Sequence, residues 1–199
     1  MDTGGVSGTM STMTTTVERL TDDEWERLRD VRIEALTEDG SVFGSSLERE
    51  SGFRESHWRM RLRASPWFVA GEDGRDVGLV CVISEPGAGP DDRHVVALWV
   101  RAVRRGNGIG TALLDAAVDW SRQDGATTVS LWLLEGNEGA AELYRSHGFR
   151  PTGISMPLPR DPSRVERRWE LSLRPATGEL QQEPGGLHRA PAPDPLEPE

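Results

Sequence analysis

A glycine-rich segment, Arg101–Thr111, combines the residue types that bind phosphate groups. Its three glycines lack side chains, so the backbone can approach a ligand closely and leave its amides facing that ligand. A helix is predicted to begin at about Ile109, and the positive end of its dipole would lie at the same point. Arg104 and Arg105 add two full positive charges. The segment therefore predicts a binding site for a pyrophosphate group.

Two familiar nucleotide-binding motifs do not fit this segment. A P-loop needs a lysine, and all 23 basic residues of the chain are arginine, so an ordinary NTPase site is excluded. A dinucleotide-binding fingerprint would need glycine at position 111, which is Thr111. The preceding strand also falls late in the chain, after a predicted hairpin. For the glycines alone, a plain turn with arginines facing water remains the simpler interpretation.

A second motif follows the next predicted strand and narrows the choice. The two motifs read Arg105-x-x-Gly-x-Gly110 and Asn137-x-x-Ala-x-x-x-Tyr144, the latter followed by Gly148-Phe149. In these residues the sequence resembles the GNAT family of acyl-CoA-dependent N-acyltransferases. The resemblance covers roughly residues 17–173 by the order of elements and is specific in residues 98–149.

The resemblance implies that acetyl-CoA is the co-substrate and that no metal is needed. Backbone groups of Leu98, Trp99 and Val100 would pair with the pantetheine arm as an added strand. Asn137 matches the family position that hydrogen-bonds this arm. The loop that contacts the pyrophosphate would comprise Arg105, Gly106, Asn107, Gly108, Ile109, Gly110 and Thr111.

Tyr144 is the predicted catalytic residue, because it matches the family tyrosine that lies close to the cofactor's sulfur. A tyrosine has a reference pKa of about 10 against about 8.5 for a thiol, so it stays protonated and can donate to the departing thiolate. A backbone N–H of strand 98–100 would stabilise the tetrahedral oxyanion. Plainer interpretations are that Tyr144 packs in a core and that Asn137 caps a helix.

The general base is the point at which the sequence departs from the family pattern. Many members carry a glutamate within the central strand, whereas this chain has Val95, Val96 and Ala97 there. His94 and Glu85 could accept a proton through water. The plainer interpretation is that both are ordinary polar residues of the surface. An amine whose pKa is lowered by the site, or a chain of waters, could then serve instead of a protein base.

The elements that must position these residues follow from the apolar pattern. The clearest helix begins at Ile109, where apolar residues recur at i, i+3, i+4, i+7, i+8 and i+11 as far as Trp120. The order of elements is strand, two helices, three strands, helix, strand, helix and two strands. This order predicts an α/β fold. As in GNAT proteins, the mixed, mostly antiparallel central sheet would be splayed between its fourth and fifth strands and flanked by helices.

Several boundaries are also predicted. Thr21 and Glu24 form a capping-box pattern that opens a helix ending near Gly40, and Gly40–Ser56 is expected to be irregular. A short helix should cover Glu55–Arg63. The remaining expected segments are strands at Thr14–Leu20, Trp67–Ala70, Val77–Ser84, His94–Val100 and Thr128–Leu134, a helix at Glu138–His147, and a last strand carrying Val165, Trp169, Leu171 and Leu173.

Length and composition bound the domain organisation. The 199 residues suit one domain, expected at residues 17–174. The Gly-, Ser- and Thr-rich segment 1–16 and the Pro-rich acidic tail 175–199 are expected to be disordered. A single cysteine, Cys81, lies in an apolar run and is expected in the core rather than as a nucleophile.

Charge and hydropathy exclude further classes. A net charge of -10 argues against a nucleic-acid binder and favours a cationic acceptor. The longest apolar run, Val77–Ile83, is too short to cross a membrane. The lone cysteine and the absence of a signal-like amino terminus indicate a cytoplasmic protein.

The sequence therefore predicts an N-acetyltransferase that moves the acetyl group of acetyl-CoA to a primary amine of a small molecule or peptide. Transfer would be a direct attack within a ternary complex, and a homodimer is compatible with the chain. Two alternatives stay open at this stage. One is a protein N-terminal acetyltransferase, and the other is a non-catalytic acyl-CoA-binding regulatory module.

Overall fold

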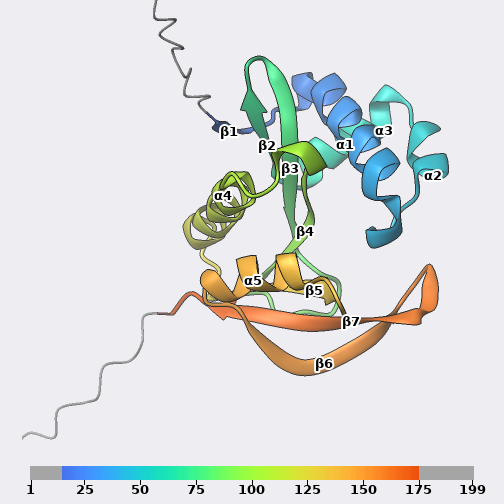
Figure 1. Ribbon diagram of the computed structural model, residues 1–199. Helices are drawn as coiled ribbons and strands as arrows, with labels where there is room; N and C mark the ends of the chain where they lie inside the picture. The colour runs from blue at the N-terminus through green and yellow to red at the C-terminus, as the bar shows by residue number, and fades with distance from the viewer. Residues whose placement is uncertain (1–14, 175–199) are drawn as a thin grey trace, which may run out of the picture.

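The apolar runs of the sequence pair into one seven-stranded sheet, in the order β1-β2-β3-β4-β5-β7-β6 (Figure 1). The structure, a computed structural model, describes residues 15–174, so the predicted disordered segments lie outside the described residues except for positions 15 and 16. Neighbouring strands are antiparallel except β4 and β5, which confirms the mixed sheet. The strands are β1 (Thr16–Arg19), β2 (Trp67–Glu72), β3 (Arg75–Ile83), β4 (Asp92–Val100), β5 (Thr128–Leu134), β6 (Arg150–Leu158) and β7 (Asp161–Ser172).

Helices connect these strands at nearly all the expected positions. One expectation is wrong in part, because Gly40–Ser56 contains the short helix α2, whose N-cap Ser46 accepts a hydrogen bond from the Arg49 N–H. A helix this short shows no apolar period in the sequence. In residues 15–174, none of the helices has both the length and the apolar character needed to cross a bilayer. The α-helices are α1 (Trp25–Asp39), α2 (Leu47–Ser51), α3 (Glu55–Ala64), α4 (Ile109–Gln123) and α5 (Glu138–Ser146).

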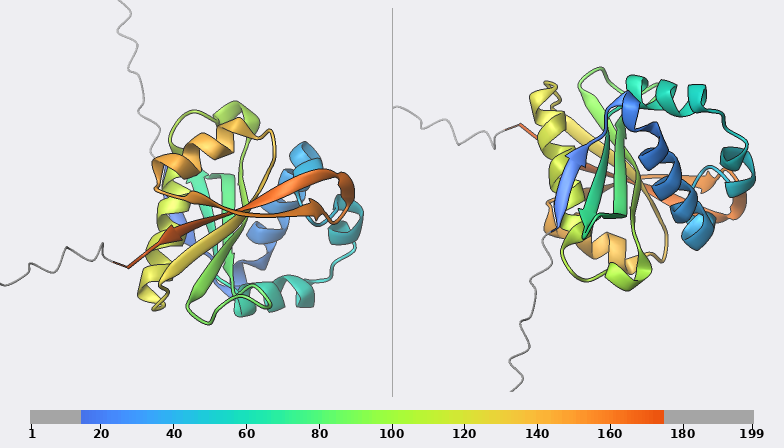
Figure 2. Two further views of the ribbon diagram at one scale, coloured as in Figure 1. Left: turned by 90° about the horizontal axis from the view of Figure 1, so that it is seen from below. Right: turned by 90° about the horizontal axis from the view of Figure 1, so that it is seen from above.

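The sheet separates two apolar cores. Helix α4 lies on one side of β2–β4, and α1 to α3 lie on the other (Figures 1 and 2). Strand β3 serves both cores, because alternate side chains of a strand point to opposite faces. Val80 and Val82 join the core under α4 and α5, whereas Leu79 and Cys81 join the core under α1 and α3. Cys81 is therefore a core residue, and burial raises the pKa of its thiol.

Strands β4 and β5 separate partway along their length. They pair only between Asp92–Val95 and Thr128–Leu131. A bulge in β4 follows at once, where the pairing with β3 shifts register and Ala97 adopts a φ of 59°. The rest of β4 keeps β3 as its partner and leaves the edge towards β5 open. This geometry confirms the predicted splay between the fourth and fifth strands.

Helix α4 approaches the sheet closely at Gly78. A Cβ atom at this position would lie 2.9 Å from the backbone oxygen of Trp99 and 2.9 Å from Cδ1 of Leu113. Real side chains do not sustain such contacts, and the Trp99 oxygen belongs to a paired strand that cannot yield easily. Gly78 thus sets the distance between α4 and the sheet.

Replacing this glycine tests the packing. We expect Gly78→Ala to lower the free energy of unfolding by about 1–3 kcal/mol, because the added methyl group must push α4 or β4 away. Denaturant unfolding measures the change. Gly89→Ala is the matched control, since a Cβ there meets nothing within 4 Å. Equal stability of the two variants would contradict the close approach.

Candidate functional site

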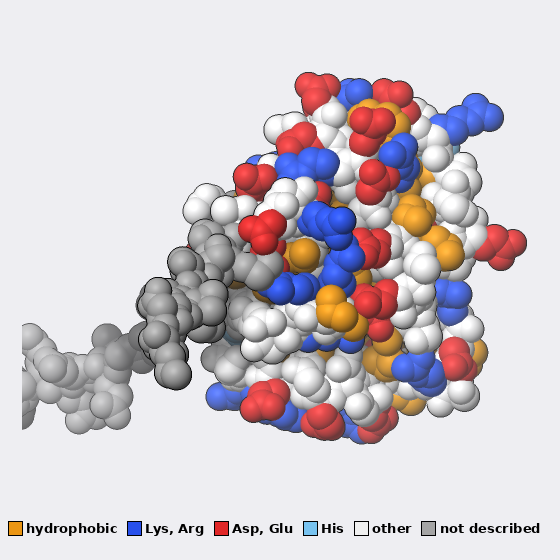
Figure 3. Space-filling model, turned by 45° about the horizontal axis from the view of Figure 1, so that its top comes forward, with side chains coloured by type: hydrophobic (Ala, Val, Ile, Leu, Met, Phe, Trp, Pro, Cys, Tyr) orange, Lys and Arg blue, Asp and Glu red, His pale blue; other side chains and the backbone are white. Residues whose placement is uncertain are grey.

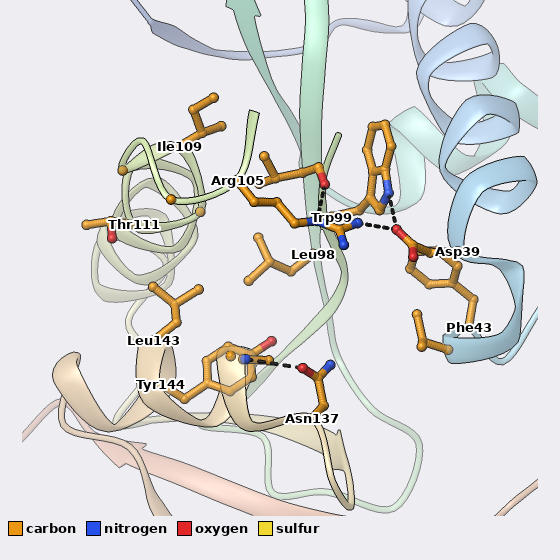
Figure 4. Close-up of a pocket in the computed structure, with 17 residues that line it drawn as sticks. Asp39, Phe43, Leu98, Trp99, Arg105, Ile109, Thr111, Asn137, Leu143 and Tyr144 are labelled. Atoms are coloured by element: carbon orange, nitrogen blue, oxygen red, sulfur yellow. Dashed lines mark hydrogen bonds and ion pairs between the residues drawn. The ribbon is translucent and has the colours of Figure 1, made fainter. Parts of the chain in front are cut away.

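A cavity of about 650 Å³ opens where β4 and β5 part (Figure 4). It brings together residues from the bulged half of β4, the glycine loop, the start of α4 and the helix α5. Every residue that the sequence predicts as a catalytic or cofactor-binding residue lines it, except Asn107. The residues that line it and were predicted are Leu98, Trp99, Val100, Arg105, Gly106, Gly108, Ile109, Gly110, Thr111, Asn137 and Tyr144.

The glycine loop has the backbone conformation that only glycine adopts readily. Gly106 and Gly108 have φ values of 78° and 80°, in the left-handed region, and Gly108 is the N-cap of α4. A Cβ at either position would meet nothing within 4 Å. The N–H groups of the first turn of α4 find no acceptor within the helix and carry its positive dipole end. The loop therefore presents unshielded backbone to an anion.

Two side chains of the loop brace it. Asn107, which does not line the cavity, donates from Nδ2 to the carbonyl oxygens of Arg104 and Arg105 at 3.1 and 3.3 Å. Arg104 pairs with the buried Glu72, at 2.5 Å between Nη2 and Oε2. These contacts hold the loop against β2 and leave Arg105 as the arginine that lines the cavity.

Arg105 spans the cavity rather than pointing along the loop. Its Nε donates to the carbonyl oxygen of Val100 at 2.8 Å, and its Nη2 pairs with Asp39 at the end of α1. Asp39 also accepts from Nε1 of Trp99 at 2.8 Å. Sequence analysis missed Asp39, since nothing in its local sequence distinguishes it from other acidic residues that end a helix.

Helix α5 supplies two polar groups to the cavity (Figure 4). The Oδ1 of Asn137 accepts from the N–H of Ala140 at 3.2 Å, so Asn137 caps α5 and also lines the cavity. Tyr144 packs its ring against Phe149 and is nearly buried. Burial raises the pKa of Tyr144, which keeps its hydroxyl protonated at neutral pH. Asn137 can thus be a helix cap and also contact a cofactor, and Tyr144 can be a core residue and also act as an acid.

A polar cluster lies beside the cavity, at the point where β4 and β5 still pair. His94 is only 2% exposed, so its interpretation as a surface residue is wrong. Its Nδ1 contacts Oγ of Ser130 at 2.8 Å, and Ser130 donates to Oδ2 of Asp92 at 2.7 Å. Arg168 pairs with both Asp92 and Glu85. Without Arg168, the carboxylates of Glu85 and Asp92 would suit a bound cation. The guanidinium of Arg168 already supplies that positive charge.

This cluster fixes the protonation of His94. The hydroxyl of Ser130 donates its one proton to Asp92, so in its contact with His94 it must accept. The proton in that contact therefore lies on Nδ1 of His94. In the neutral ring this leaves Nε2 unprotonated. Burial lowers the pKa of His94 from 6.5 to about 4, despite the carboxylate of Glu85 at 3.6 Å. His94 also lines a smaller cavity of about 230 Å³ within the splay, together with Tyr144 and Glu166. At neutral pH this cavity therefore holds an uncharged imidazole.

The lowered pKa predicts a loss of stability in acid. The unfolded chain binds the histidine proton near pH 6.5 and the folded chain only near pH 4, so the stabilisation is complete above pH 6.5 and falls as the pH drops towards 4. We expect His94→Asn, which keeps a donor for Ser130, to reduce this loss by roughly 2 kcal/mol. Urea unfolding at pH 7 and pH 4.5 measures it. A His94→Asn variant that keeps the full pH dependence of the wild type would contradict the assignment.

The comparisons with known proteins agree with this geometry. The family model described as Acetyltransferase (GNAT) family matches residues 24–149. The structure of yncA from Salmonella typhimurium with its cofactor acetyl-CoA superposes with a TM-score of 0.64 at 17% identity, over 82% of this chain and 96% of the other. At that identity the likeness concerns the fold alone.

Curated relatives match at higher identity but over part of their length. An uncharacterised N-acetyltransferase of Methanocaldococcus jannaschii is 33% identical over 46% of this chain and 42% of its own length. The mycothiol acetyltransferase of Rothia mucilaginosa is 32% identical over 83% of this chain and 49% of its own length. The chain thus spans less than half the length of these two relatives. With the family model matched over most of residues 15–174 and the sheet splayed around the glycine loop, the chain belongs to the GNAT family of acetyltransferases.

Proposed function

We propose that this protein transfers the acetyl group of acetyl-CoA to a primary amine of a small molecule or peptide, by direct attack in a ternary complex. One observation carries the proposal. The glycine loop, the open edge of β4 and the polar groups of α5 line one cavity of about 650 Å³. The printed names of its relatives, N-acetyltransferase and mycothiol acetyltransferase, support acetyl transfer as the reaction class.

The cavity offers a separate feature to each part of acetyl-CoA. The left-handed glycines and the first turn of α4 suit the diphosphate. The edge of β4 at Leu98–Val100, which β5 leaves unpaired, suits the amide groups of the pantetheine arm. Asn137 uses Oδ1 as a helix cap, so its Nδ2 is the group that can donate to the arm. The thioester would then lie near Tyr144.

The residues present can supply the steps of the transfer. A backbone N–H of Leu98–Val100 stabilises the oxyanion that forms when the amine attacks the thioester carbon. Tyr144 can donate a proton to the sulfur as the C–S bond breaks, because burial raises its pKa and its hydroxyl is protonated at neutral pH. Water in the smaller cavity, which His94 lines, can carry away the proton that the amine loses. Bringing both reactants together contributes a large share of the acceleration.

We expect Gly108→Val to weaken acetyl-CoA binding at least about tenfold, equivalent to about 1.4 kcal/mol, because the side chain would block the approach of the diphosphate to the backbone. Titration calorimetry measures the affinity. Gly87→Val is the matched control, since Gly87 has a similar φ of 86° and equally open surroundings but lies outside the cavity. Unchanged affinity in Gly108→Val would remove the loop from the binding site.

We expect Tyr144→Phe to lower turnover about 100-fold while acetyl-CoA affinity changes little, because the ring is kept and only the acidic proton is lost. Release of the CoA thiol with saturating acetyl-CoA and a panel of amines measures turnover. Unchanged turnover, with chemistry rate-limiting, would exclude Tyr144 as the acid. Acetyl-CoA binding by the wild type with no thiol release on any amine would favour the non-catalytic module. Release only with protein amino termini would favour the N-terminal acetyltransferase.

A further inference from the structure

A second cavity, of about 390 Å³, lies on the α1–α3 face of the sheet and contains a buried cluster of charges. We call it the arginine pocket, after Arg32 of α1 and Arg61 of α3, which line it together with Glu50 of α2. Its floor consists of side chains of β2, β3 and β4. Phe43, Gly44, Val96 and Ala97 line both the arginine pocket and the cavity within the splay, so the two spaces adjoin.

Two guanidinium groups share one carboxylate in this pocket. Arg32 donates to Glu50 from Nη2 at 3.0 Å and from Nε at 3.2 Å. Arg61 donates to the same carboxylate from Nη1 at 2.8 Å. The side chains of Arg32 and Glu50 are 6% and 0% exposed, and that of Arg61 is 26% exposed. The three side chains therefore bring a net charge of +1 to the pocket.

One donor of the cluster is left without an acceptor. Nη1 of Arg32 is buried and has no hydrogen-bond partner among the described residues. Burial disfavours ionisation of Glu50, but the hydrogen bonds and charges of Arg32 and Arg61 outweigh it, so the pKa of Glu50 lies below its usual range. Glu50 is thus already fully engaged, and a buried cationic donor with no partner is costly. A second anion in the pocket would balance the excess positive charge of Arg32 and Arg61.

A purely structural role accounts for only part of this arrangement. The ion pairs fasten α1, α2 and α3 to one another, but two guanidinium groups on one carboxylate leave one positive charge unbalanced. The second arginine makes the pocket cationic. Planar guanidinium groups that converge on one space are suited to a carboxylate, which they bind by short charge-assisted hydrogen bonds.

The walls of the pocket define the rest of the ligand. The guanidinium carbon of Arg32 lies 4.5 Å from the centre of the Phe43 ring, and Trp67, Ile83 and Val96 add apolar surface. A ligand with its anionic end at the arginines can therefore place an apolar body along these walls. Ala97 also lines the cavity within the splay, so the amine on the same carbon as the carboxylate can face the proposed position of the thioester.

We propose that the acceptor amine carries a carboxylate that binds Arg32 and Arg61, together with an apolar side chain, as in an apolar amino acid. This inference rests on the proposed acetyl transfer and specifies its substrate class. It replaces the cationic acceptor that the net charge of -10 favours. Acidic and basic side chains are intermixed over the surface seen in Figure 3, so the overall charge does not describe this pocket.

Binding of product-like probes tests the carboxylate directly. N-acetyl-L-phenylalanine and N-acetyl-L-leucine are each compared with their uncharged amides by calorimetry, with and without CoA. None of these probes has a titrating amine, so only the carboxylate differs. We expect each acid to bind about 10- to 100-fold more tightly than its amide. Equal binding of acid and amide in both pairs would overturn the proposal.

Variants then test whether the preference for the acid over the amide arises in the arginine pocket. Arg61→Gln should abolish the preference for the acid, and Arg61→Lys should keep part of it. Arg63→Gln, two residues along α3, is the matched control, because Arg63 is 67% exposed and pairs with Asp22 outside the pocket. A preference that survives in folded Arg61→Gln would overturn the assignment. Thermal melting checks that each variant is folded. If Arg61→Gln is unfolded, the comparison of each acid with its amide on the wild type still tests the proposal.

The outcomes separate this inference from the proposed function. Acid preference without CoA release from acetyl-CoA on phenylalanine, leucine or other amines would leave the pocket in place and remove the acetyl transfer. Release of CoA on amines, with acid and amide binding equally, would keep the acetyl transfer and remove the carboxylate site in the arginine pocket.

Discussion

The end of pairing between β4 and β5 is the constraint on which the site depends. Parallel strands held together along their whole length would bury the edge of β4 and close the cavity. Instead, pairing stops after Val95 and Leu131, and the bulge at Ala97 turns the rest of β4 away. The open edge, the start of α4 and the polar residues of α5 then face one space. A glycine at position 78 keeps α4 close enough to place its first turn at the end of β4.

Local patterns made most of the fold and much of the site predictable. The apolar period from Ile109 gave the bounds of α4, because that helix buries one continuous face. The glycine motif located the loop, since only glycine adopts the backbone angles found at positions 106 and 108. Asn137 and Tyr144 lie one helix away from that loop, in a motif that the family resemblance made readable.

Contacts between distant segments could not be predicted in the same way. Asp39 reaches Arg105, and Glu50 reaches Arg61, only after the sheet has brought α1, α2 and α3 to one face. The polar cluster around His94 likewise includes Arg168 of β7, which pairs with Asp92 of β4 and which no local pattern connects to it. Each of these residues reads in the sequence as one more charged or polar group of the surface. Side-chain pairing across elements, rather than period or motif, decides their roles.

Because Arg105 pairs with Asp39, the proposed binding of acetyl-CoA at Arg105 would exchange one anion for another. A carboxylate of the protein already occupies the guanidinium that lies nearest to the glycine loop. If the diphosphate takes this guanidinium, the affinity reflects the difference between two ion pairs rather than the strength of one. An internal competitor of this kind would favour the departure of CoA under the proposed function, because Asp39 would pair with Arg105 again. The same helix, α1, carries Arg32 two turns earlier, so the proposed cofactor and acceptor sites share one supporting helix.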